Sequence, residues 1–475
     1  MMKTMPRKFL STCMLLLSAY LLAACSNSQA GGTPSEQSRL DEGIESNLNE
    51  NAMIALKSGF DHAKYFPNES GTTGYYYLEA KAAKFSPSDS KRTALNLSVV
   101  IDRSGSMEGD KLDNAKRAAK FIVNQLAEED YISIVMYDDE VKVVAASAKV
   151  GDKEALRRKI DGIEAGGSTN LGGGMQEGYA QVKSTYKQGF INRVLLLSDG
   201  LVNVGITDQG ELQRIAKNKN LENGITISTF GIGLDFNEDL MTGLSEYGSG
   251  NYYFIKNPDE IPAIFEKELK GLLNVVAQNA VLTIDLPEGT VLEKVFGYKF
   301  EQSGNRVIVN FRDIFSEETK AIMVRFNVQE RSRAQFEFKA TLSYNDATTE
   351  AKPGKQLETR DVLSLAETQL DRDKSISESI MAQVVLFESN DKLEEAMREA
   401  DQGNYSRARE VTEMNAVYLK NNDDYVRASP ELQRQEENNT SYGAGIKDAE
   451  SMSPSEFKTV QKSSKSMNYE VRKKK

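Results

Sequence analysis

Side chains that carry oxygen ligands gather in three short segments near the middle of the 475-residue chain. The segments are Asp102-Arg103-Ser104-Gly105-Ser106-Met107, Gly166-Gly167-Ser168-Thr169-Asn170 and Ser198-Asp199-Gly200. Alternate residues of a tight loop share a side, and Gly105 relaxes the turn between the two serines, so Asp102, Ser104 and Ser106 can point at one place. With Thr169 and Asp199 they make five hard oxygen ligands, which suit Mg²⁺, or Mn²⁺ or Ca²⁺ in its place.

Each segment also has a plainer interpretation. Asp102 to Ser106 alone is a polar turn that arises often by chance, and Asp199 is equally suited to a turn or a helix cap. Thr169 suits the N-cap of a helix that begins near residue 171, and Ser168 is an alternative ligand to Thr169. The order of all three segments along the chain is what favours a metal site.

Other chemistries find little support in the sequence. The chain has one histidine, His62, outside the central region, and Cys13 and Cys25 both lie near the N-terminus, so histidine-dependent hydrolysis and zinc sites are nearly excluded. The glycines at 172–174 lack the lysine of a phosphate-binding loop, and Gly231-Ile232-Gly233 lacks the third glycine of a dinucleotide site. Met107 stands where a calcium loop of the EF-hand type needs glycine.

Buried strands alternate with amphipathic helices around the three segments. Apolar runs at 94–101 and 193–197 read as strands, and the apolar positions of 111–127 recur at helical spacing. This alternation predicts a doubly wound, mostly parallel α/β domain over 92–278. Open sheets of this kind place ligands at the carboxyl ends of their strands, where all three segments would emerge.

The five residues resemble the metal-ion-dependent adhesion site (MIDAS) of von Willebrand factor type A (VWA) domains. That site combines Asp-x-Ser-x-Ser with a distant threonine and aspartate, and Asp102, Ser104, Ser106, Thr169 and Asp199 fill all five positions. The resemblance implies that the serines and the threonine bind the metal directly, that the aspartates bind directly or through water, and that a partner's carboxylate supplies the last ligand.

The regions flanking the α/β domain follow other patterns. Period-two alternation predicts an antiparallel, sandwich-like β domain over 279–370, with segment 52–91 pairing to it. Residues 371–420 read as a helical hairpin, and the polar stretch 421–475 as a disordered tail.

The N-terminus carries an export signal. Cations precede an apolar run that ends in Leu22-Ala23-Ala24-Cys25, which resembles a bacterial lipobox. We therefore expect a lipoprotein signal peptide over 1–24, lipidation of Cys25 and a flexible tether over 25–51. Loss of the signal changes the formal charge from −11 to −14, which argues against nucleic-acid binding.

Together these features are similar to bacterial VWA lipoproteins, a group often labelled calcium-activated chloride channel homologues or compared with inter-alpha-trypsin inhibitor heavy chains. The resemblance predicts a non-enzymatic, lipid-anchored envelope protein that binds an acidic side chain of a protein partner through the metal. In a Gram-negative organism Ser26, which is not aspartate, favours the outer membrane. A metal-dependent hydrolase and a structural envelope protein with a loop-stabilising metal are the alternatives.

Two further expectations concern charges near the site. Arg103, inside the first segment, is expected to point to solvent. The acidic run Asp138-Asp139-Glu140 is expected to be a solvated turn, with a second weak cation site as the alternative.

Overall fold

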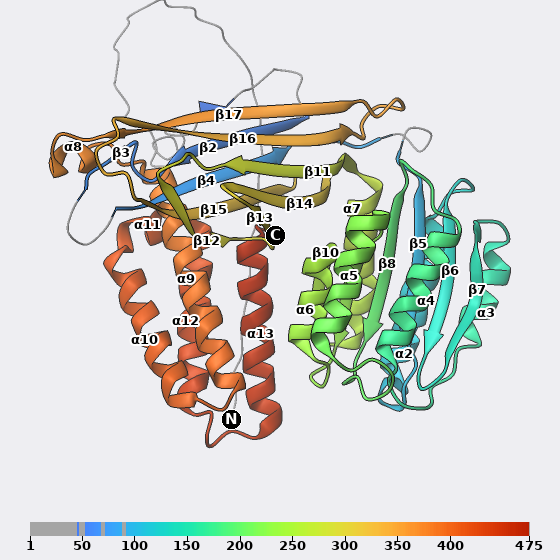
Figure 1. Ribbon diagram of the computed structural model, residues 1–475. Helices are drawn as coiled ribbons and strands as arrows, with labels where there is room; N and C mark the ends of the chain where they lie inside the picture. The colour runs from blue at the N-terminus through green and yellow to red at the C-terminus, as the bar shows by residue number, and fades with distance from the viewer. Residues whose placement is uncertain (1–44, 47–52, 68–71, 88–91, 475) are drawn as a thin grey trace, which may run out of the picture.

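The computed structural model describes residues 45–46, 53–67, 72–87 and 92–474, which form an α/β domain, a β-sandwich and a helical bundle (Figure 1). The predicted signal peptide and its lipidation residue Cys25 lie outside the described residues, as does most of the predicted tether. Within that tether, however, β1 (Glu45–Ser46) pairs with β2 (Ile54–Phe60), so this part is not purely a flexible linker.

The α/β domain is built on a six-stranded sheet in the order β10-β9-β8-β5-β6-β7. Every neighbouring pair is parallel except β6 with β7, which form an antiparallel edge. The strands are β5 (Leu95–Asp102), β6 (Tyr131–Tyr137), β7 (Val141–Lys149), β8 (Ile191–Ser198), β9 (Thr226–Ile232) and β10 (Ser249–Ile255). The predicted mostly parallel, doubly wound fold is confirmed.

Helices cover both faces of this sheet. They are η2 (Gly105–Met107), α2 (Asp110–Gln125), α3 (Lys153–Asp161), α4 (Leu171–Ser184), α5 (Gln209–Asn223), α6 (Glu238–Tyr247), η3 (Pro258–Glu260) and α7 (Ile261–Leu273). Ile101 of β5 packs in one core cluster with side chains of α2 and α7. The preceding residue, Val100, points to the other face of the sheet and packs in a second cluster with side chains of α4 and α6. Because both faces are covered, all eight residues of β5 are buried, including the polar residues Asn96, Ser98 and Asp102 among its apolar ones.

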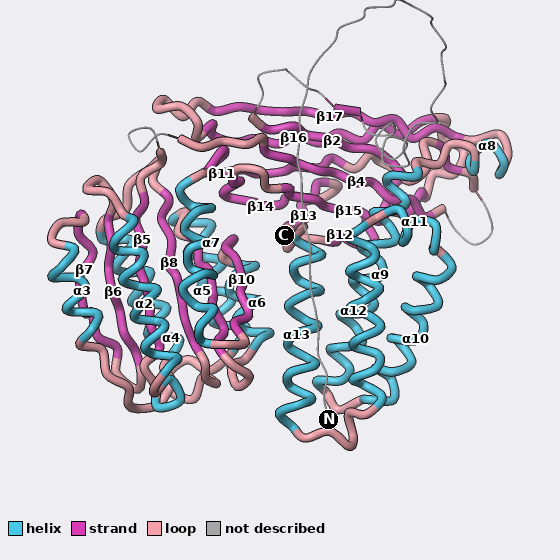
Figure 2. The backbone as a smooth tube through the Cα atoms, turned by 180° about the vertical axis from the view of Figure 1, so that it is seen from behind, coloured by secondary structure: helices cyan, strands magenta, loops and turns pink. Residues whose placement is uncertain are grey.

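The β-sandwich consists of two sheets in the orders β1-β2-β4-β15-β12 and β13-β14-β11-β16-β17-β3 (Figure 2). Its other strands are β3 (Lys64–Tyr65), β4 (Thr73–Ala82), β11 (Val275–Asp285), β12 (Thr290–Phe296), β13 (Glu301–Ser303), β14 (Arg306–Phe315), β15 (Thr319–Val328), β16 (Gln335–Asp346) and β17 (Gly354–Leu365). Strands from before the α/β domain, β2, β3 and β4, join strands from after it, so the α/β domain is an insertion in the sandwich.

A buried charge network joins the sandwich to the α/β domain. Arg193, on β8, lies 2.8 Å from Glu268 of α7 and 3.1 Å from Asp313 of β14, and its side chain is 1% exposed. Breaking one partner of such a buried network leaves an uncompensated charge, which costs several kcal/mol. The network therefore holds the amino-terminal half of β8 against the sandwich, and the carboxyl ends of the parallel strands lie at the opposite end of the domain (Figure 1).

The chain ends in helices where the sequence predicted first a hairpin and then a disordered tail. These are α8 (Gln369–Asp373), α9 (Glu378–Asp401), α10 (Tyr405–Asn421), α11 (Asp423–Ala428), α12 (Pro430–Lys447) and α13 (Pro454–Lys473). The prediction of disorder over 421–475 was therefore wrong, and the hairpin is part of a larger bundle. None of the helices in the described residues has the length and apolarity needed to cross a membrane.

Polar residues of the bundle pair with one another in its interior, which explains the misleading composition. Asn415 donates to Asn439 over 2.8 Å, and Asn390 donates to Asn468 over 2.8 Å, with Gln435 also donating to Asn468. All five side chains are at most 3% exposed. Amides that hydrogen-bond one another can be buried, whereas composition alone predicts that they are solvated.

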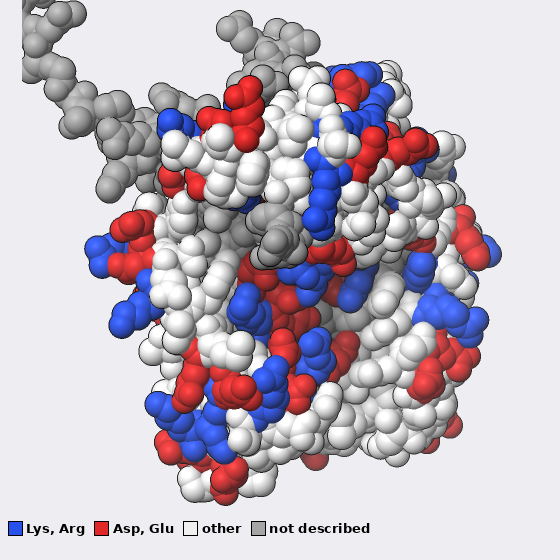
Figure 3. Space-filling model, turned by 60° about the vertical axis from the view of Figure 1, so that its left-hand side comes forward, with Lys and Arg blue, Asp and Glu red and all other residues white. Residues whose placement is uncertain are grey.

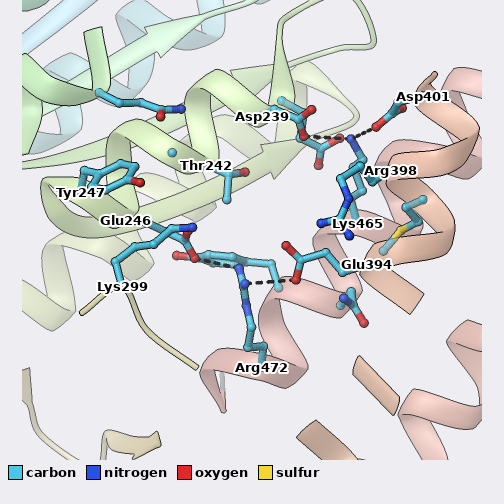
Figure 4. Close-up of a pocket in the computed structure, with 16 residues that line it drawn as sticks. Asp239, Thr242, Glu246, Tyr247, Lys299, Glu394, Arg398, Asp401, Lys465 and Arg472 are labelled. Atoms are coloured by element: carbon cyan, nitrogen blue, oxygen red, sulfur yellow. Dashed lines mark hydrogen bonds and ion pairs between the residues drawn. The ribbon is translucent and has the colours of Figure 1, made fainter. Parts of the chain in front are cut away.

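Helix α13 contacts the α/β domain mainly through long charged side chains. Lys458, Lys465 and Arg472 of α13 lie within 3.0 Å of carboxylates of residues 235, 239 and 246, respectively, in the α/β domain. Charges of both signs are interspersed on the molecular surface (Figure 3). Figure 4 shows the cleft between α6 and the bundle, where Lys465 bridges Asp239 and Asp401, and Arg472 bridges Glu246 and Glu394.

Glu246 gives this contact a pH dependence. Burial raises its pKa, but Arg472, Lys473 and Lys299 lower it more, and the net result is a pKa of about 2 in place of 4.5. A depressed carboxylate pKa contributes stability that is complete above about pH 5 and disappears as the pH falls toward 2. This shift corresponds to about 3 kcal/mol of unfolding free energy.

We predict that Glu246→Gln is less stable than wild type by about 3 kcal/mol at pH 7, and that this difference shrinks as the pH falls below about 5. Urea denaturation of both proteins from pH 7 to pH 3 measures it. Glu266→Gln, which removes an exposed carboxylate paired with Lys270, is the control and should change stability little. A difference that stays constant over this pH range contradicts the prediction.

Candidate metal centre

Three loops meet at the carboxyl end of the parallel sheet. The loop at 102–107 follows β5, the loop at 198–200 follows the neighbouring strand β8, and the loop at 166–170 precedes α4. The backbone N–H of Gly105 donates to the carbonyl of Gly167 over 3.2 Å, and that of Gly166 donates to the carbonyl of Arg103 over 2.8 Å. The loops at 102–107 and 166–170, the first and second along the chain, are thus held together through their main chains, and the loop at 198–200 is the third.

Asp102 is the most deeply placed of the predicted site residues. Its carboxylate is fully buried and accepts hydrogen bonds from the backbone N–H of Ser104 at 2.9 Å, the hydroxyl of Ser198 at 2.8 Å and, more weakly, the hydroxyl of Tyr137 at 3.3 Å. Burial raises the pKa of Asp102 to about 6, although the bonds from Ser104 and Ser198 oppose the rise and the charge of Asp199 adds to it. None of these hydrogen-bond donors from the described residues carries a positive charge.

The two serines of the first loop connect Asp102 with the third loop. The hydroxyl oxygens of Ser104 and Ser106 lie 3.3 Å apart, and the Ser106 hydroxyl donates to Oδ1 of Asp199 over 2.8 Å. Ser104 and Asp199 are buried, whereas Ser106 is exposed. The site therefore has a buried base and an open rim.

Thr169 reaches the same place from the second loop. Its backbone N–H donates to the side-chain carbonyl of Asn203 over 2.8 Å. A Cβ added at Gly200 would lie 3.1 Å from the Thr169 hydroxyl oxygen and 3.6 Å from that of Ser106, so the two hydroxyls border one space. The alternative ligand, Ser168, is more exposed, and its backbone N–H approaches Asp139 at 3.3 Å. The geometry favours Thr169.

Arg103 and the acidic run brace the loops, contrary to expectation. The Arg103 guanidinium lies 2.5 Å from the carboxylate of Asp138 and donates to the carbonyl of Glu164 over 3.1 Å. Its side chain is only 16% exposed and that of Asp138 only 4%. The prediction of a solvent-pointing Arg103 was therefore wrong, and the prediction of a solvated turn fails for Asp138 but holds for the exposed Asp139 and Glu140, because Arg103 and Asp138 pair across 35 positions of sequence.

The sequence alone did not predict a role in the site for three further residues. Ser198 and Tyr137 bond Asp102 as described, and Lys111, in the first turn of α2, places its ammonium 2.5 Å from Oδ2 of Asp199. Ser198 directly precedes Asp199 at the end of a buried strand, and this position could have predicted that its hydroxyl lies in the site. Tyr137 and Lys111 belong to other elements, and no local pattern identifies them.

The donor set fits a small divalent cation. Two carboxylates and three hydroxyls supply hard oxygen ligands, with no thiol or imidazole among them. His62 lies in the sandwich region, where it hydrogen-bonds Asp61 at 2.9 Å. No group of three or more His, Cys, Asp or Glu side chains placed to hold a metal occurs in the described residues. Asp102, Ser104, Ser106, Thr169 and Asp199 would hold the ion.

The comparisons with known proteins identify the central fold. Residues 96–267 match the model of the von Willebrand factor type A domain. The chain is 35% identical over 212 residues to the uncharacterized protein YfbK of Escherichia coli, and this alignment covers 44% of this chain and 37% of that protein. It is 31% identical over 208 residues to the uncharacterized protein sll0103 of Synechocystis, covering 44% and 48%. The chain thus spans less than half of these relatives.

Two solved structures resemble most of the chain. A von Willebrand factor type A protein from Catenulispora acidiphila superposes with a TM-score of 0.62 at 14% identity, covering 82% of this chain and 91% of that one. The ArnB paralog VWA2 from Sulfolobus acidocaldarius gives 0.59 at 18% identity, covering 87% and 98%. These likenesses show the fold, a VWA domain with additional antiparallel sheets and C-terminal helices.

The hydroxyl of Ser198 gives a test of how the site is held. We predict that Ser198→Ala leaves one oxygen of the buried Asp102 carboxylate without its strongest side-chain donor, which destabilises the metal-free protein by about 1–3 kcal/mol. Loss of such a supporting bond also weakens metal binding roughly 10–100-fold. Urea denaturation and calorimetric Mg²⁺ titration measure the two effects.

Ser98→Ala is the matched control for that experiment. Ser98 is a buried serine of β5, adjacent to β8, and its hydroxyl has no hydrogen-bond partner among the described residues. Its removal should leave Mg²⁺ affinity unchanged. Equal effects of the two substitutions on Mg²⁺ affinity would show that Ser198 does not support Asp102.

Proposed function

We propose that this chain is a lipid-anchored cell-envelope protein whose VWA domain binds a protein partner through a divalent cation, Mg²⁺ or else Mn²⁺ or Ca²⁺. One observation carries the proposal, namely that two buried carboxylates and three hydroxyls from three separate loops face one space at the end of the sheet. VWA domains mediate protein–protein interactions and often do so through a metal site of this type.

The form of the site favours an acidic ligand from the partner. The buried base holds the carboxylates, whereas the rim at Gly105 and Ser106 is exposed. A divalent ion bound by few charged ligands retains the capacity to attract another, and a carboxylate of a partner protein provides the hard oxygen it prefers. The formal charge of −11 for the whole chain supports a protein partner over nucleic acid.

We also propose that the site is not catalytic. Metal-assisted hydrolysis needs a group that accepts a proton from water. Asp102 and Asp199 are both engaged with their neighbours, and Lys111 already occupies one oxygen of Asp199. The site therefore offers a ligand-binding surface and no evident general base, which makes the hydrolase alternative the weaker one.

A Mg²⁺ titration tests the ligand set directly. We predict saturable binding to the chain from Gly32 onward, which keeps every described residue, and loss of that binding in Asp102→Ala and in Thr169→Ala. Ser168→Ala should bind like wild type, because its hydroxyl is not needed. Isothermal calorimetry measures all four proteins. Loss of binding in Ser168→Ala with retention in Thr169→Ala would reverse the assignment of the second loop.

The alternative of a purely structural metal has a different outcome. It predicts that Mg²⁺ raises the unfolding temperature while no envelope protein crosslinks to the chain in a metal-dependent way. The binding function predicts crosslinked partners that disappear with a chelator and in Asp102→Ala. Partners that remain after chelation would overturn the role of the metal in recognition.

The lipid anchor rests on Cys25 and is tested separately. We predict that cells supplied with an alkyne analogue of palmitate label the wild-type chain, and that Cys25→Ala abolishes the labelling because no acceptor remains. Cys13→Ala, which changes the other cysteine, is the control and should stay labelled. Fractionation of the same cells tests localisation to the outer membrane if the organism is Gram-negative.

A further inference from the structure

Lys111 provides a positive charge inside the candidate metal centre. Its ammonium nitrogen lies 2.5 Å from Oδ2 of Asp199 and 3.1 Å from the backbone carbonyl oxygen of Ser106. Asp199 is fully buried, whereas the lysine side chain is 27% exposed. The lysine thus approaches from the rim and directly contacts one of the five predicted ligands.

Local helix preferences do not account for a lysine at this position. Lys111 is the second residue of α2, where the helix dipole disfavours cations, and the N-cap residue Gly109 offers no side-chain cap. Its stem passes Gly233, where an added Cβ would lie 3.6 Å from Cε and Nζ of the lysine. Gly233 has a φ of 73°, a conformation suited to glycine. The surrounding chain therefore leaves the stem a path to Asp199.

The other charges around Lys111 are already paired. Asp235 lies near enough to interact with Lys111, but Lys458 of α13 contacts it at 2.8 Å and is the main cause of its lowered pKa. Arg103 is paired with Asp138. Asp139 approaches the second loop only through the backbone N–H of Ser168, at 3.3 Å. The charges that contact the five predicted ligands in the described residues are therefore the carboxylates of Asp102 and Asp199 themselves and the ammonium of Lys111.

We infer that Lys111 sets the ligand preference of the site by making the metal-loaded centre positive. A divalent ion between two carboxylates is neutral overall, and Lys111 leaves one positive charge in excess. That excess weakens the affinity for the cation and strengthens the affinity for a carboxylate ligand, whose charge it balances. The inference rests on the proposed function, whose acidic ligand it explains.

The test compares Lys111→Met with wild type in two titrations. The chain from Gly32 onward is titrated with Mg²⁺ by calorimetry, and the Mn²⁺-loaded chain is titrated with acetate while water-proton relaxation is followed. We expect Lys111→Met to bind Mg²⁺ about tenfold more tightly and acetate about tenfold more weakly, since one nearby charge is removed from a partly exposed site. Acetamide, the uncharged analogue, should not compete in either protein.

Two further variants separate charge from structure. Lys111→Arg keeps the positive charge and should resemble wild type in both titrations. Lys116→Met removes a lysine of the same helix whose ammonium donates to the carbonyl of Asp161, and it should also resemble wild type. Circular dichroism melts check that each variant is folded. If Lys111→Met fails to fold, Lys111→Gln replaces it.

The outcomes distinguish this inference from the proposed function. Tighter Mg²⁺ binding with weaker acetate binding in Lys111→Met supports the inference, as does Mg²⁺ binding that appears only in this variant. Unchanged or weakened Mg²⁺ affinity of Lys111→Met overturns the inference and assigns Lys111 the role of holding Asp199 in place. In that case the proposed function still stands if the wild-type chain binds Mg²⁺. No metal binding in any variant overturns both.

Discussion

A carboxylate buried at the end of the central strand is the constraint around which the site is built. Asp102 is fully buried, and burying an ionised carboxylate is costly unless it is hydrogen-bonded and neutralised. The neighbouring strands β6 and β8 supply hydroxyls from Tyr137 and Ser198, and the following loop supplies the N–H of Ser104. None of these brings a positive charge, and Asp199 adds a second negative one. The fold therefore maintains a place where a cation is favourable.

The convergence of the candidate residues was predictable because the loops that carry them obey a topological rule. Parallel neighbours end at the same edge of a sheet, so loops that follow β5 and β8 must meet wherever those strands pair. Residues that act through distant partners were not predictable in this way. Arg103 and Lys111 carry the pattern of exposed surface residues, and only the fold shows that one pairs with Asp138 and the other with Asp199.

The same distinction separates the predicted from the unpredicted parts of the fold. In the α/β domain the buried positions are mostly apolar, so the spacing of apolar residues in the sequence predicts the strands and helices directly. The C-terminal bundle instead buries amides such as Asn415 and Asn439, which hydrogen-bond each other from different helices. One local signal was readable, because Ser453 and Glu456 form a capping box that begins α13, and that spacing is visible in the sequence.

The arrangement of the α/β domain, the sandwich and the bundle explains why the candidate metal centre has an exposed rim. Arg193 holds the amino-terminal half of β8 against the sandwich, so the carboxyl ends of the sheet face away from it. At that far end Lys458 of α13 contacts Asp235, which follows β9, and this places the start of α13 beside the loops of the site. The exposed Ser106 thus lies at an end of the sheet that the sandwich leaves free. Both ion pairs and buried contact hold α13 there, because Lys458 and Lys465 pair with Asp235 and Asp239 while the Tyr469 ring packs edge-on against Tyr252 in the core of the α/β domain.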